Sequence, residues 1–341
     1  MNQVLAGVRV LEMEAIGPVP WAGMILADLG ATVVRIARPE PADMGIVRDP
    51  RFEVTTRGKQ RETVDLKSAA GRARVLELAA EADVLIEGMR PGVMERLGLG
   101  PQDCWQHNPA LVYGRITGWG QSGPLASTVG HDINYLALSG VLHAIGPADG
   151  APAVPLNLIG DFGAGGMLLL VGVLAALMQA RSTGKGQLVD AAMVDGALLM
   201  LAPILGRWQA GQWQDQRASN LLDGGAPFYS TYQTADHKAV AVGAIEPRFY
   251  KALLDGLGLD SDSLPQQHDQ SAWPVMKERF AEIFGRYPRA HWEAVFAGTE
   301  ACVTPVLSLA ETVTHPHFVE RGSFVRSDGV VQPAAAPRFS C

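Results

Sequence analysis

The sequence predicts an α/β fold built on a parallel, doubly wound sheet, with a second, smaller α+β domain. Three observations predict it. Apolar strands alternate with helices over the first third of the chain, which is typical of a parallel sheet. The middle is helical, and the last third holds a hairpin pattern followed by helices. With 341 residues, 48% of them hydrophobic and 18% charged, the chain can bury one large or two medium cores.

The first third is assigned from its apolar periodicity. Apolar runs predict strands at 8–13, 32–36, 83–87 and 110–116. Helical spacing predicts helices at 21–29, where Gly30 ends the first, and at 69–82. Ligands of parallel sheets bind beyond the carboxyl ends of the strands. The pattern is therefore Rossmann-like, but no GxGxxG follows the first strand, so a dinucleotide site is not supported.

The middle of the chain is predicted to be helical and to end in a polar linker. The expected helices are 131–145, 161–181 and 193–209. The expected strands of a hairpin are 228–234 and 238–243, joined through Ala235-Asp236-His237. Because His237 stands where a glycine would turn most easily, we expect a less regular turn.

Two more helices, a strand and a short helix follow the hairpin. They are expected at 247–257, 273–286, 303–307 and near 309–314. We predict a large Rossmann-like domain, a linker, a small α+β domain and a return to the large domain, at 1–200, 201–224, 225–300 and 301–341.

Composition excludes several classes of function. The net charge of -7 argues against general nucleic-acid binding. Cys104, Cys302 and Cys341 lie far apart, so we expect neither a disulfide framework nor a metal site. The start of the chain has no signal-peptide pattern, and the apolar stretch Met167–Ala180 is too short to span a bilayer. We expect a cytoplasmic protein without a membrane partner.

Two polar segments stand at the starts of apolar helices. Gly130-His131-Asp132-Ile133-Asn134-Tyr135 opens the first, and its acidic and amide groups could simply cap the helix. Asp161 stands at the head of the second, where an N-cap explains it equally well. The glycines at 163, 165 and 166 weaken a helix, so they favour a close approach of another body to the backbone.

Other charged residues have simpler explanations when taken alone. Glu246 precedes Pro247 at a helix start, which is ordinary complementation of the helix dipole. A set of basic residues near strand ends could be solvated surface charge, but it is also the best candidate for binding phosphates. The set is Arg38, Arg57, Lys59, Lys67, Arg90 and Arg96.

Several motifs in order resemble one family. GHDINYLALSG (130–140), NLIGDFGAGGM (157–167), GKGQLVDAAMVDG (184–196), LLDGGAPFY (221–229) and VGAIEPRFY (242–250) resemble the α-methylacyl-CoA racemases of the family III CoA-transferase (CaiB/BaiF-like) superfamily. The resemblance covers nearly the whole chain. It implies an isomerase of lipid metabolism that interconverts (R)- and (S)-2-methylacyl-CoA and works as an interlocked homodimer.

The resemblance also implies roles for individual residues. His131 and Asp161 match the catalytic pair, and Glu246 matches a glutamate that the partner subunit delivers near the histidine. Ile16, Asp132, Tyr135 and Asn157 are expected to line the substrate pocket. Arg38, Lys67, Arg90 and Arg96 correspond to the CoA site. No cofactor or metal is expected, because CoA arrives as part of the substrate.

The chemistry of inversion fits such a pair. Removing the proton next to a thioester carbonyl leaves an enolate, and inversion needs a base on one face and an acid on the other. By resemblance His131 serves the (S) face and Asp161 the (R) face. We expect the main-chain N–H of Asp132 to bind the enolate oxygen and an apolar, methionine-rich surface to hold the acyl tail.

Two other functions remain open at this stage. In a CoA-transferase of the same fold, Asp161 would attack the thioester and carry CoA through a covalent intermediate. A non-catalytic CoA-binding protein would bind CoA without α-proton exchange. His131 and Glu246 in their motifs favour the racemase.

Overall fold

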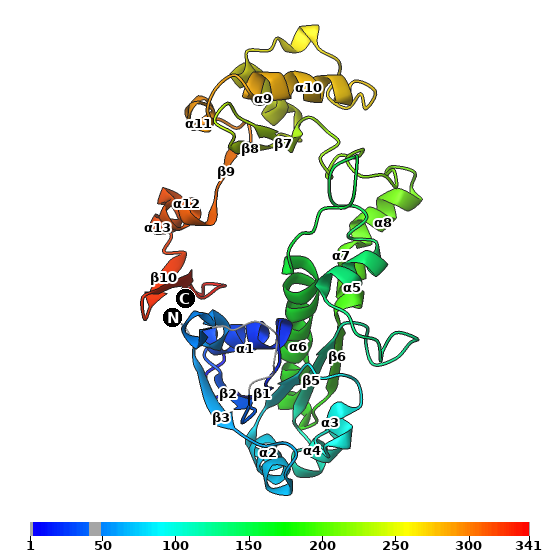
Figure 1. The fold of residues 1–341 in the computed structure, drawn as a ribbon, viewed down its shortest axis with the longest axis vertical. Coiled ribbons are helices and arrows are strands. Elements are labelled where there is room, and N and C mark those ends of the chain that lie inside the picture. The colour runs from blue at the N-terminus through cyan, green and yellow to red at the C-terminus, as the bar shows by residue number, and fades with distance from the viewer. Residues whose placement is uncertain (1–2, 41–48, 341) are drawn as a thin grey trace. The chain divides into compact units, whose positions relative to one another are not determined.

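The structure is a computed structural model that describes residues 3–40 and 49–340. Its contacts divide the chain into two compact units (Figure 1). Unit 1 comprises 1–141, 155–202 and 320–341, and unit 2 comprises 142–154 and 203–319. Cys341, one of the three cysteines considered above, lies outside the described residues.

Unit 1 is built on a six-stranded parallel sheet, which confirms the predicted α/β class. Its strands are β1 (Arg9–Met13), β2 (Thr32–Ala37), β3 (Lys59–Thr63), β4 (Val84–Glu87), β5 (Val112–Thr117) and β6 (Leu188–Ala192). Their order is β3-β2-β1-β4-β5-β6. Strand order reverses between β1 and β4, and the crevice beyond that point is where doubly wound sheets bind ligands.

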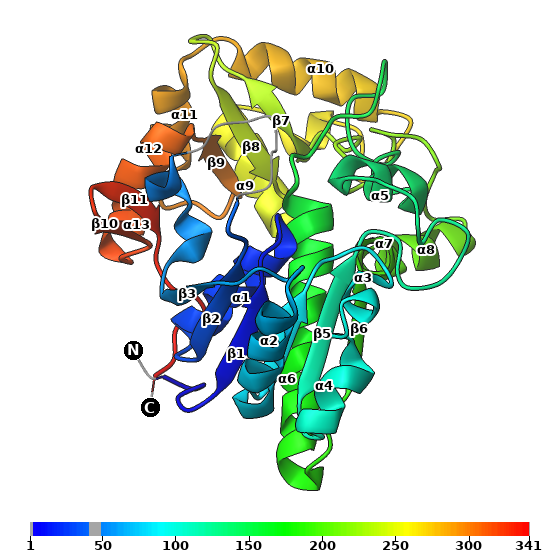
Figure 2. The ribbon, with the colours of Figure 1, turned by 60° about the horizontal axis from the view of Figure 1, so that its bottom comes forward.

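Helices cover both faces of this sheet. Two successive residues of β1 point to opposite faces of the sheet. Val10 packs in the same core as α1 (Pro18–Asp28) and α6 (Met167–Thr183). Leu11 packs in the other core, with α2 (Ala69–Glu81) and α4 (Pro101–His107). Figure 2 shows α2 and α4 lying along the sheet. Both faces are therefore buried, which explains why the inner strands read as continuous apolar runs.

The short helices of unit 1 differ from the sequence prediction. The helix expected at 131–145 is α5 (Asp132–Ser139), which ends where Gly140 takes φ 85°. The helix expected at 193–209 is split into α7 (Met193–Met200) in unit 1 and α8 (Ala202–Gln209), which lies in unit 2 except for its first residue. Another short helix of this unit is α3 (Val93–Arg96), and two 3-10 helices lie at Pro50–Phe52 and Val54–Thr56. Strand β3 was not predicted, because its sequence KQRET lacks an apolar pattern.

The helix expected at 161–181 begins earlier and is wound differently. Residues Leu158–Gly166 form a π-helix that runs directly into α6. Together they make a 26-residue helix that contains an 18-residue window of mean hydropathy 1.9, so the prediction that this stretch is too short to span a bilayer is wrong by length and composition. Leu169, Val173 and Leu177 nevertheless lie buried in the main core of unit 1, as in the central helix of a globular domain.

Unit 2 combines a three-stranded antiparallel sheet with helices. The strands are β7 (Tyr229–Gln233), β8 (Ala239–Gly243) and β9 (Val303–Val306). Besides α8, its helices include α9 (Pro247–Leu257), α10 (Trp273–Phe284), α11 (Arg289–Phe296), α12 (Leu309–Thr314) and α13 (Pro316–Glu320). In the hairpin turn His237 takes φ 59°, the left-handed conformation that glycine adopts most easily.

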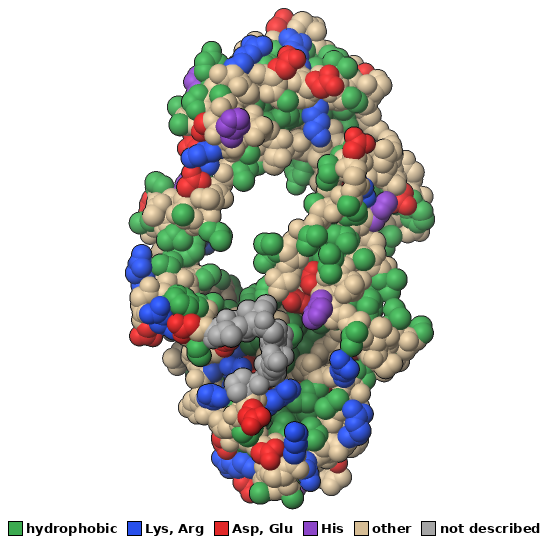
Figure 3. Space-filling view, in the orientation of Figure 1, with side chains coloured by type: hydrophobic (Ala, Val, Ile, Leu, Met, Phe, Trp, Pro, Cys, Tyr) green, Lys and Arg blue, Asp and Glu red, His purple; other side chains and the backbone are tan. Residues whose placement is uncertain are grey.

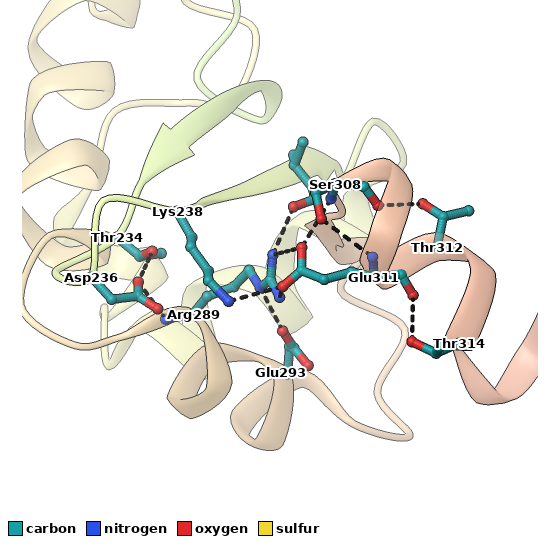
Figure 4. Close-up of polar contacts among 10 residues, drawn as sticks. Thr234, Asp236, Lys238, Arg289, Glu293, Ser308, Glu311, Thr312 and Thr314 are labelled. Carbon is teal, nitrogen blue, oxygen red and sulfur yellow. Dashed lines mark hydrogen bonds and ion pairs between the residues drawn. The ribbon is translucent and has the colours of Figure 1, made fainter.

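A polar network joins α12 to the sheet of unit 2 (Figure 4). The Arg289 guanidinium donates to both carboxylate oxygens of Glu311 and to the carbonyl of Val306. Lys238 Nζ also donates to Glu311, at 2.9 Å. Glu311 in turn completes a capping box with Ser308 at the start of α12. These bonds fix the segment that follows β9.

The last strands return to unit 1. They are β10 (Phe324–Ser327) and β11 (Val330–Pro333), which pair as a hairpin. Arg57 attaches the hairpin, since its Nη1 donates to Gln332 Oε1 at 3.1 Å and to the carbonyl of Pro333 at 2.6 Å. The same guanidinium makes a two-bond ion pair with Asp28.

Candidate active site

His131 stands at the start of α5. It is the N-cap residue, and its main-chain N–H donates to Asn134 Oδ1 at 3.0 Å. Asn134 therefore has the capping role that the sequence allowed. The His131 imidazole is exposed and makes no hydrogen bond to another described residue. It is available for chemistry.

Tyr135 supports the turn before this histidine. Its ring is buried and meets the Trp119 ring edge-on at 4.8 Å between centroids. The Tyr135 hydroxyl donates to the carbonyl of Gly130, and burial raises the pKa of this phenol to about 12. Tyr135 therefore holds the main chain that presents His131.

Asp161 lies inside the π-helix, not at its N-cap as the sequence suggested. The helix begins three residues earlier, at Leu158, so Asp161 still lies in the first turn. π-Helical turns are rare and concentrate at functional sites. A wide turn also suits the glycines that follow, because a Cβ at Gly166 would lie 2.7 Å from the Trp21 ring. The glycines thus allow α1 to pack closely against this helix.

Among the described residues, the carboxyl group of Asp161 has one side chain as a direct hydrogen-bond partner. Asn157 Nδ2 donates to Asp161 Oδ2 at 3.0 Å. Burial raises the pKa of Asp161, with a further rise from the nearby Asp132 charge, whereas the Asn157 hydrogen bond and His131 lower it. The net direction is upward. A raised pKa favours the protonated form that an acid catalyst needs.

Asp132 joins the two segments. Its Oδ2 accepts a hydrogen bond from the main-chain N–H of Asp161 at 2.7 Å, although Asp132 directly follows His131 in the chain. The side chain is buried, and its second oxygen, Oδ1, has no partner among the described residues. This hydrogen bond brings together the segments that carry His131 and Asp161. Its two residues, Asp132 and Asp161, are 29 positions apart in the sequence.

The loop after β1 closes one side of this site. Gly17 takes φ 67°, and a Cβ there would lie 3.0 Å from Asp161 Oδ2. The neighbouring Ile16 is exposed. Gly88, after β4, approaches the same loop, since its Cβ would lie 3.5 Å from that of Ala15. The acidic group therefore stands at the reversal point of the sheet, where the fold predicts a ligand.

Four of the six basic candidates are exposed beside the carboxyl ends of the strands. Arg38 follows β2, Lys67 follows β3 and Arg90 follows β4, while Arg96 ends α3. None of the four forms an ion pair with another described residue. Figure 3 shows Lys and Arg side chains scattered over this unit with acidic side chains among them. These four are free to meet an anionic ligand.

The other two basic candidates are structural. Arg57 is engaged by Asp28 and by the β10–β11 hairpin, as described above. Lys59 Nζ donates to Glu12 Oε2 at 2.6 Å and to the carbonyl of Pro20 at 2.7 Å, and both ionic side chains are buried. The hypothesis that Arg57 and Lys59 belong to a phosphate site is therefore wrong. A glutamate inside the apolar strand β1 was the sequence signal that a buried cation was needed.

A second buried cluster, which sequence reasoning missed, braces the loop of Arg90. Arg115 on β5 donates to Glu95 Oε1 at 2.8 Å and to Gln121 Oε1 at 2.9 Å. Its Nε lies 3.4 Å from Glu87 Oε1 at the end of β4. Glu87 Oε2 also accepts from the N–H of Met89 at 2.6 Å, next to Arg90. Burial raises the pKa of Glu87 to about 7.

Glu246 belongs to unit 2. It is the N-cap residue of α9, and its side chain is exposed. Gln267 fixes the chain just before it, because Gln267 Nε2 donates to the carbonyls of Ala244 at 3.2 Å and Ile245 at 2.7 Å. Glu246 thus stands at the start of α9, directly after a segment that Gln267 holds in place.

The chain is similar to known proteins over nearly its whole length. It matches CoA-transferase family III over residues 5–340. It is 46% identical over 334 residues to the alpha-methylacyl-CoA racemase of Mus musculus, covering 98% of this chain and 85% of the relative. It is 32% identical over 347 residues to the acetyl-CoA:oxalate CoA-transferase of Acetobacter aceti, covering 98% and 88%. The crystal structure of a CaiB/BaiF family protein from Brucella suis is similar with TM-score 0.85 and 26% identity, covering 100% of this chain and 93% of that chain.

Proposed function

Because the chain belongs to CoA-transferase family III, we propose that it is an acyl-CoA racemase that interconverts (R)- and (S)-2-methylacyl-CoA. The observation that carries the proposal is the hydrogen bond from the Asp161 main chain to Asp132, which gathers an exposed imidazole and a half-buried carboxyl group at one place. The 46% identity to a racemase, against 32% to a transferase, supports the same choice.

The reaction removes one proton from the α-carbon and adds another proton to its opposite face. For one direction the neutral His131 imidazole removes the α-proton, and the electron pair passes onto the thioester oxygen as an enolate. Protonated Asp161 then donates its proton to the opposite face, and the C–H bond forms with inverted configuration. In the reverse direction the roles exchange, with His131 serving the (S) face and Asp161 the (R) face.

The enolate oxygen needs a fixed donor. The main-chain N–H of Asp132 is the first amide of α5 and has no acceptor among the described residues, so it is free to donate to the oxygen. Donors of this kind lower the barrier by about 2.7–4 kcal/mol in acyl-transfer enzymes.

Exposed apolar side chains support an acyl site beside this pair. Leu156 and Leu158 flank Asn157, and Met200 approaches the π-helix, because a Cβ at Gly163 would lie 3.0 Å from Met200 Cε. All three side chains are exposed. A surface with a methionine adapts to different chain shapes, as both epimers require.

The CoA part of the substrate needs cations. Arg38, Lys67, Arg90 and Arg96 are exposed near the carboxyl edge of the sheet and would pair with its phosphates. The brace formed by Glu87, Arg115 and Glu95 would keep the Arg90 loop in place.

We also propose an interlocked homodimer in the cytoplasm, in which Glu246 of the partner subunit approaches His131. Exposed apolar residues on α6, such as Val171 and Met178, support a covering partner. Analytical ultracentrifugation tests the dimer. A monomer at all concentrations would contradict it.

The main test is α-proton exchange. The protein is mixed with (R)-2-methylacyl-CoA in deuterium oxide without an acceptor acid, and deuterium at the α-carbon is followed by mass spectrometry. We expect exchange and inversion in the wild type and their loss in His131→Ala and Asp161→Ala, each with CoA binding retained. The exposed residues His107 and Asp149 provide matched controls, His107→Ala and Asp149→Ala.

The transferase alternative gives the opposite result. If Asp161 were a nucleophile, turnover would require an acceptor acid, and Asp161 would carry a covalent acyl group that hydroxylamine releases. An active His131→Ala protein would likewise contradict the two-group mechanism.

A further inference from the structure

We propose that Asp132 is a positioning residue, whose carboxylate holds the main-chain amides of Gly160 and Asp161 and so fixes the Asp161 carboxyl group relative to His131. This role is separate from that of the Asp132 N–H as an enolate donor. It rests on the proposed racemase function, because it concerns how the acid is held for proton transfer.

The contact is direct and protected from water. Asp132 Oδ2 lies 2.7 Å from the Asp161 nitrogen, and the main-chain N–H of Gly160 also forms a hydrogen bond with this carboxylate. The Asp132 side chain is only 5% exposed. A hydrogen bond to a carboxylate in a dry environment is stronger than one at the surface. Asp132 is also covalently bonded to His131, so one residue connects both catalytic groups.

Gly160 is the second half of the contact. A Cβ at this position would lie 2.4 Å from Asp132 Oδ2 and 2.8 Å from Asp132 Cγ, both of which belong to a short and buried side chain. The φ angle of Gly160 is not positive, so its conformation does not require glycine. Glycine is required at position 160 because Asp132 approaches it so closely. Any larger residue must push the carboxylate away from the Asp161 amide.

The same arrangement affects the charge of the acid. The negative charge of Asp132 raises the pKa of Asp161, in addition to the larger effect of burial. Among the described residues, the other polar side chains that interact with Asp161 are Asn157, His131 and Tyr135. Removing the Asp132 charge while keeping its shape should therefore lower the pKa of Asp161. A purely structural role elsewhere in the core would not move this value.

The experiment compares Asp132→Ala, Asp132→Asn and Gly160→Ala in the deuterium-exchange assay. Asp132→Ala should lower kcat about a hundredfold with KM changed less than about threefold, because a misplacement near 1 Å has this effect on rate. Asp132→Asn keeps an oxygen for the Asp161 amide, so it should stay within about tenfold of the wild type. The Asp161 limb of its pH–rate profile should move to lower pH.

Gly160→Ala gives an independent test through the other side of the contact. It should lower kcat as Asp132→Ala does. In the double variant Asp132→Ala with Gly160→Ala, the new Cβ at position 160 no longer meets the Asp132 carboxylate. The loss of kcat in the double variant should therefore be far smaller than the product of the two single losses. Gly206→Ala is the control, since Gly206 has open space around it and no positive φ. Melting temperatures of all variants check that each is folded.

The outcomes are distinct. Wild-type kcat in folded Asp132→Ala, multiplicative losses in the double variant, or an Asp132→Asn protein as slow as Asp132→Ala with an unmoved pH profile would each overturn the positioning role. A wild-type protein without α-exchange would instead overturn the proposed function. If Asp132→Ala does not fold, Asp132→Asn and Gly160→Ala still decide the question.

Discussion

Lys59 Nζ and Glu12 Oε2 are 2.6 Å apart in an ion pair from which solvent is excluded, with side-chain exposures of 2% and 0%. Gly23 leaves the space for it, because a Cβ there would lie 1.8 Å from Glu12 Oε2. Lys59 also holds the carbonyl of Pro20 in the first turn of α1, close to the loop that faces Asp161. The pair therefore connects the sheet to one wall of the candidate site.

Removing one partner of this pair should be strongly destabilising. Lys59→Met leaves the Glu12 carboxylate buried without a cation, and we expect the unfolding free energy to fall by about 3–5 kcal/mol. Burial already raises the pKa of Glu12, so ionising it opposes folding as the pH rises. The loss should therefore be larger at pH 8 than at pH 5, as measured by urea unfolding.

The double variant Glu12→Gln with Lys59→Met should recover most of that loss, because no buried charge remains. Lys185→Met, at an exposed position, is the control. Equal stability of the single and double variants would contradict an uncompensated charge as the cause.

Glu87 should make the stability of unit 1 depend on pH. Its folded pKa is raised from 4.5 to about 7 by burial, so its contribution is present below pH 4.5 and is lost as the pH rises to 7. Glu87→Gln removes this ionisation. Relative to the wild type, the variant should gain on the order of 3 kcal/mol between pH 4.5 and pH 8, at about 1.36 kcal/mol per pKa unit.

Thermal unfolding in matched buffers at both pH values measures this difference. The exposed Glu320→Gln is the control, and its difference from the wild type should not change with pH. A Glu87→Gln protein that loses stability as the pH rises would show that the ion pair with Arg115 outweighs burial.

Asn157 should set the pH range in which Asp161 acts. Its hydrogen bond lowers the pKa of the Asp161 carboxyl group, against the larger effect of burial. Asn157→Ala should therefore raise that pKa and move the corresponding limb of the exchange pH–rate profile to higher pH. Gln106→Ala, on the surface of α4, should leave the profile unchanged. A shift to lower pH would contradict the assignment.

Arg57 and Arg38 should differ in what they affect. Arg38→Ala removes an exposed cation, and we expect CoA to bind about tenfold more weakly, with an unchanged melting temperature and with a reduced salt dependence. Arg57→Ala breaks the ion pair with Asp28 and frees the β10–β11 hairpin, so it should lower the melting temperature with little change in CoA affinity. Calorimetry of binding and unfolding measures both. The reverse result would restore Arg57 to the phosphate site.

Much of the sheet and of unit 2 follows from local sequence pattern. Apolar runs located β1, β2, β4 and β5 within two residues, and amphipathic spacing with Pro247 located α9. Strand β3 escaped because an edge strand with the sequence KQRET has no apolar period. Helix α5 was predicted too long because apolar spacing continues past Gly140, where the backbone turns.

The candidate site was predictable in its parts but not in its connections. His131 and Asp161 stood out because polar groups opened apolar helices. The π-helix could not be predicted from the sequence, because its winding depends on contacts with α1 and α7 that no single segment encodes. Asp132 looked like a helix cap because its partners at Gly160 and Asp161 lie far along the chain. The two buried ion pairs were hidden for the same reason.

The hydrogen bonds from Arg57 to the β10–β11 hairpin can form only late in synthesis on the ribosome. The amide acceptor, Gln332, is added 275 residues after Arg57. At about 5–20 residues per second, roughly 14–55 s pass between the synthesis of Arg57 and that of Gln332, and only then can this hydrogen bond form. All of unit 2 has been translated by then. The β10–β11 hairpin is thus among the last parts of unit 1 to join the rest of that unit.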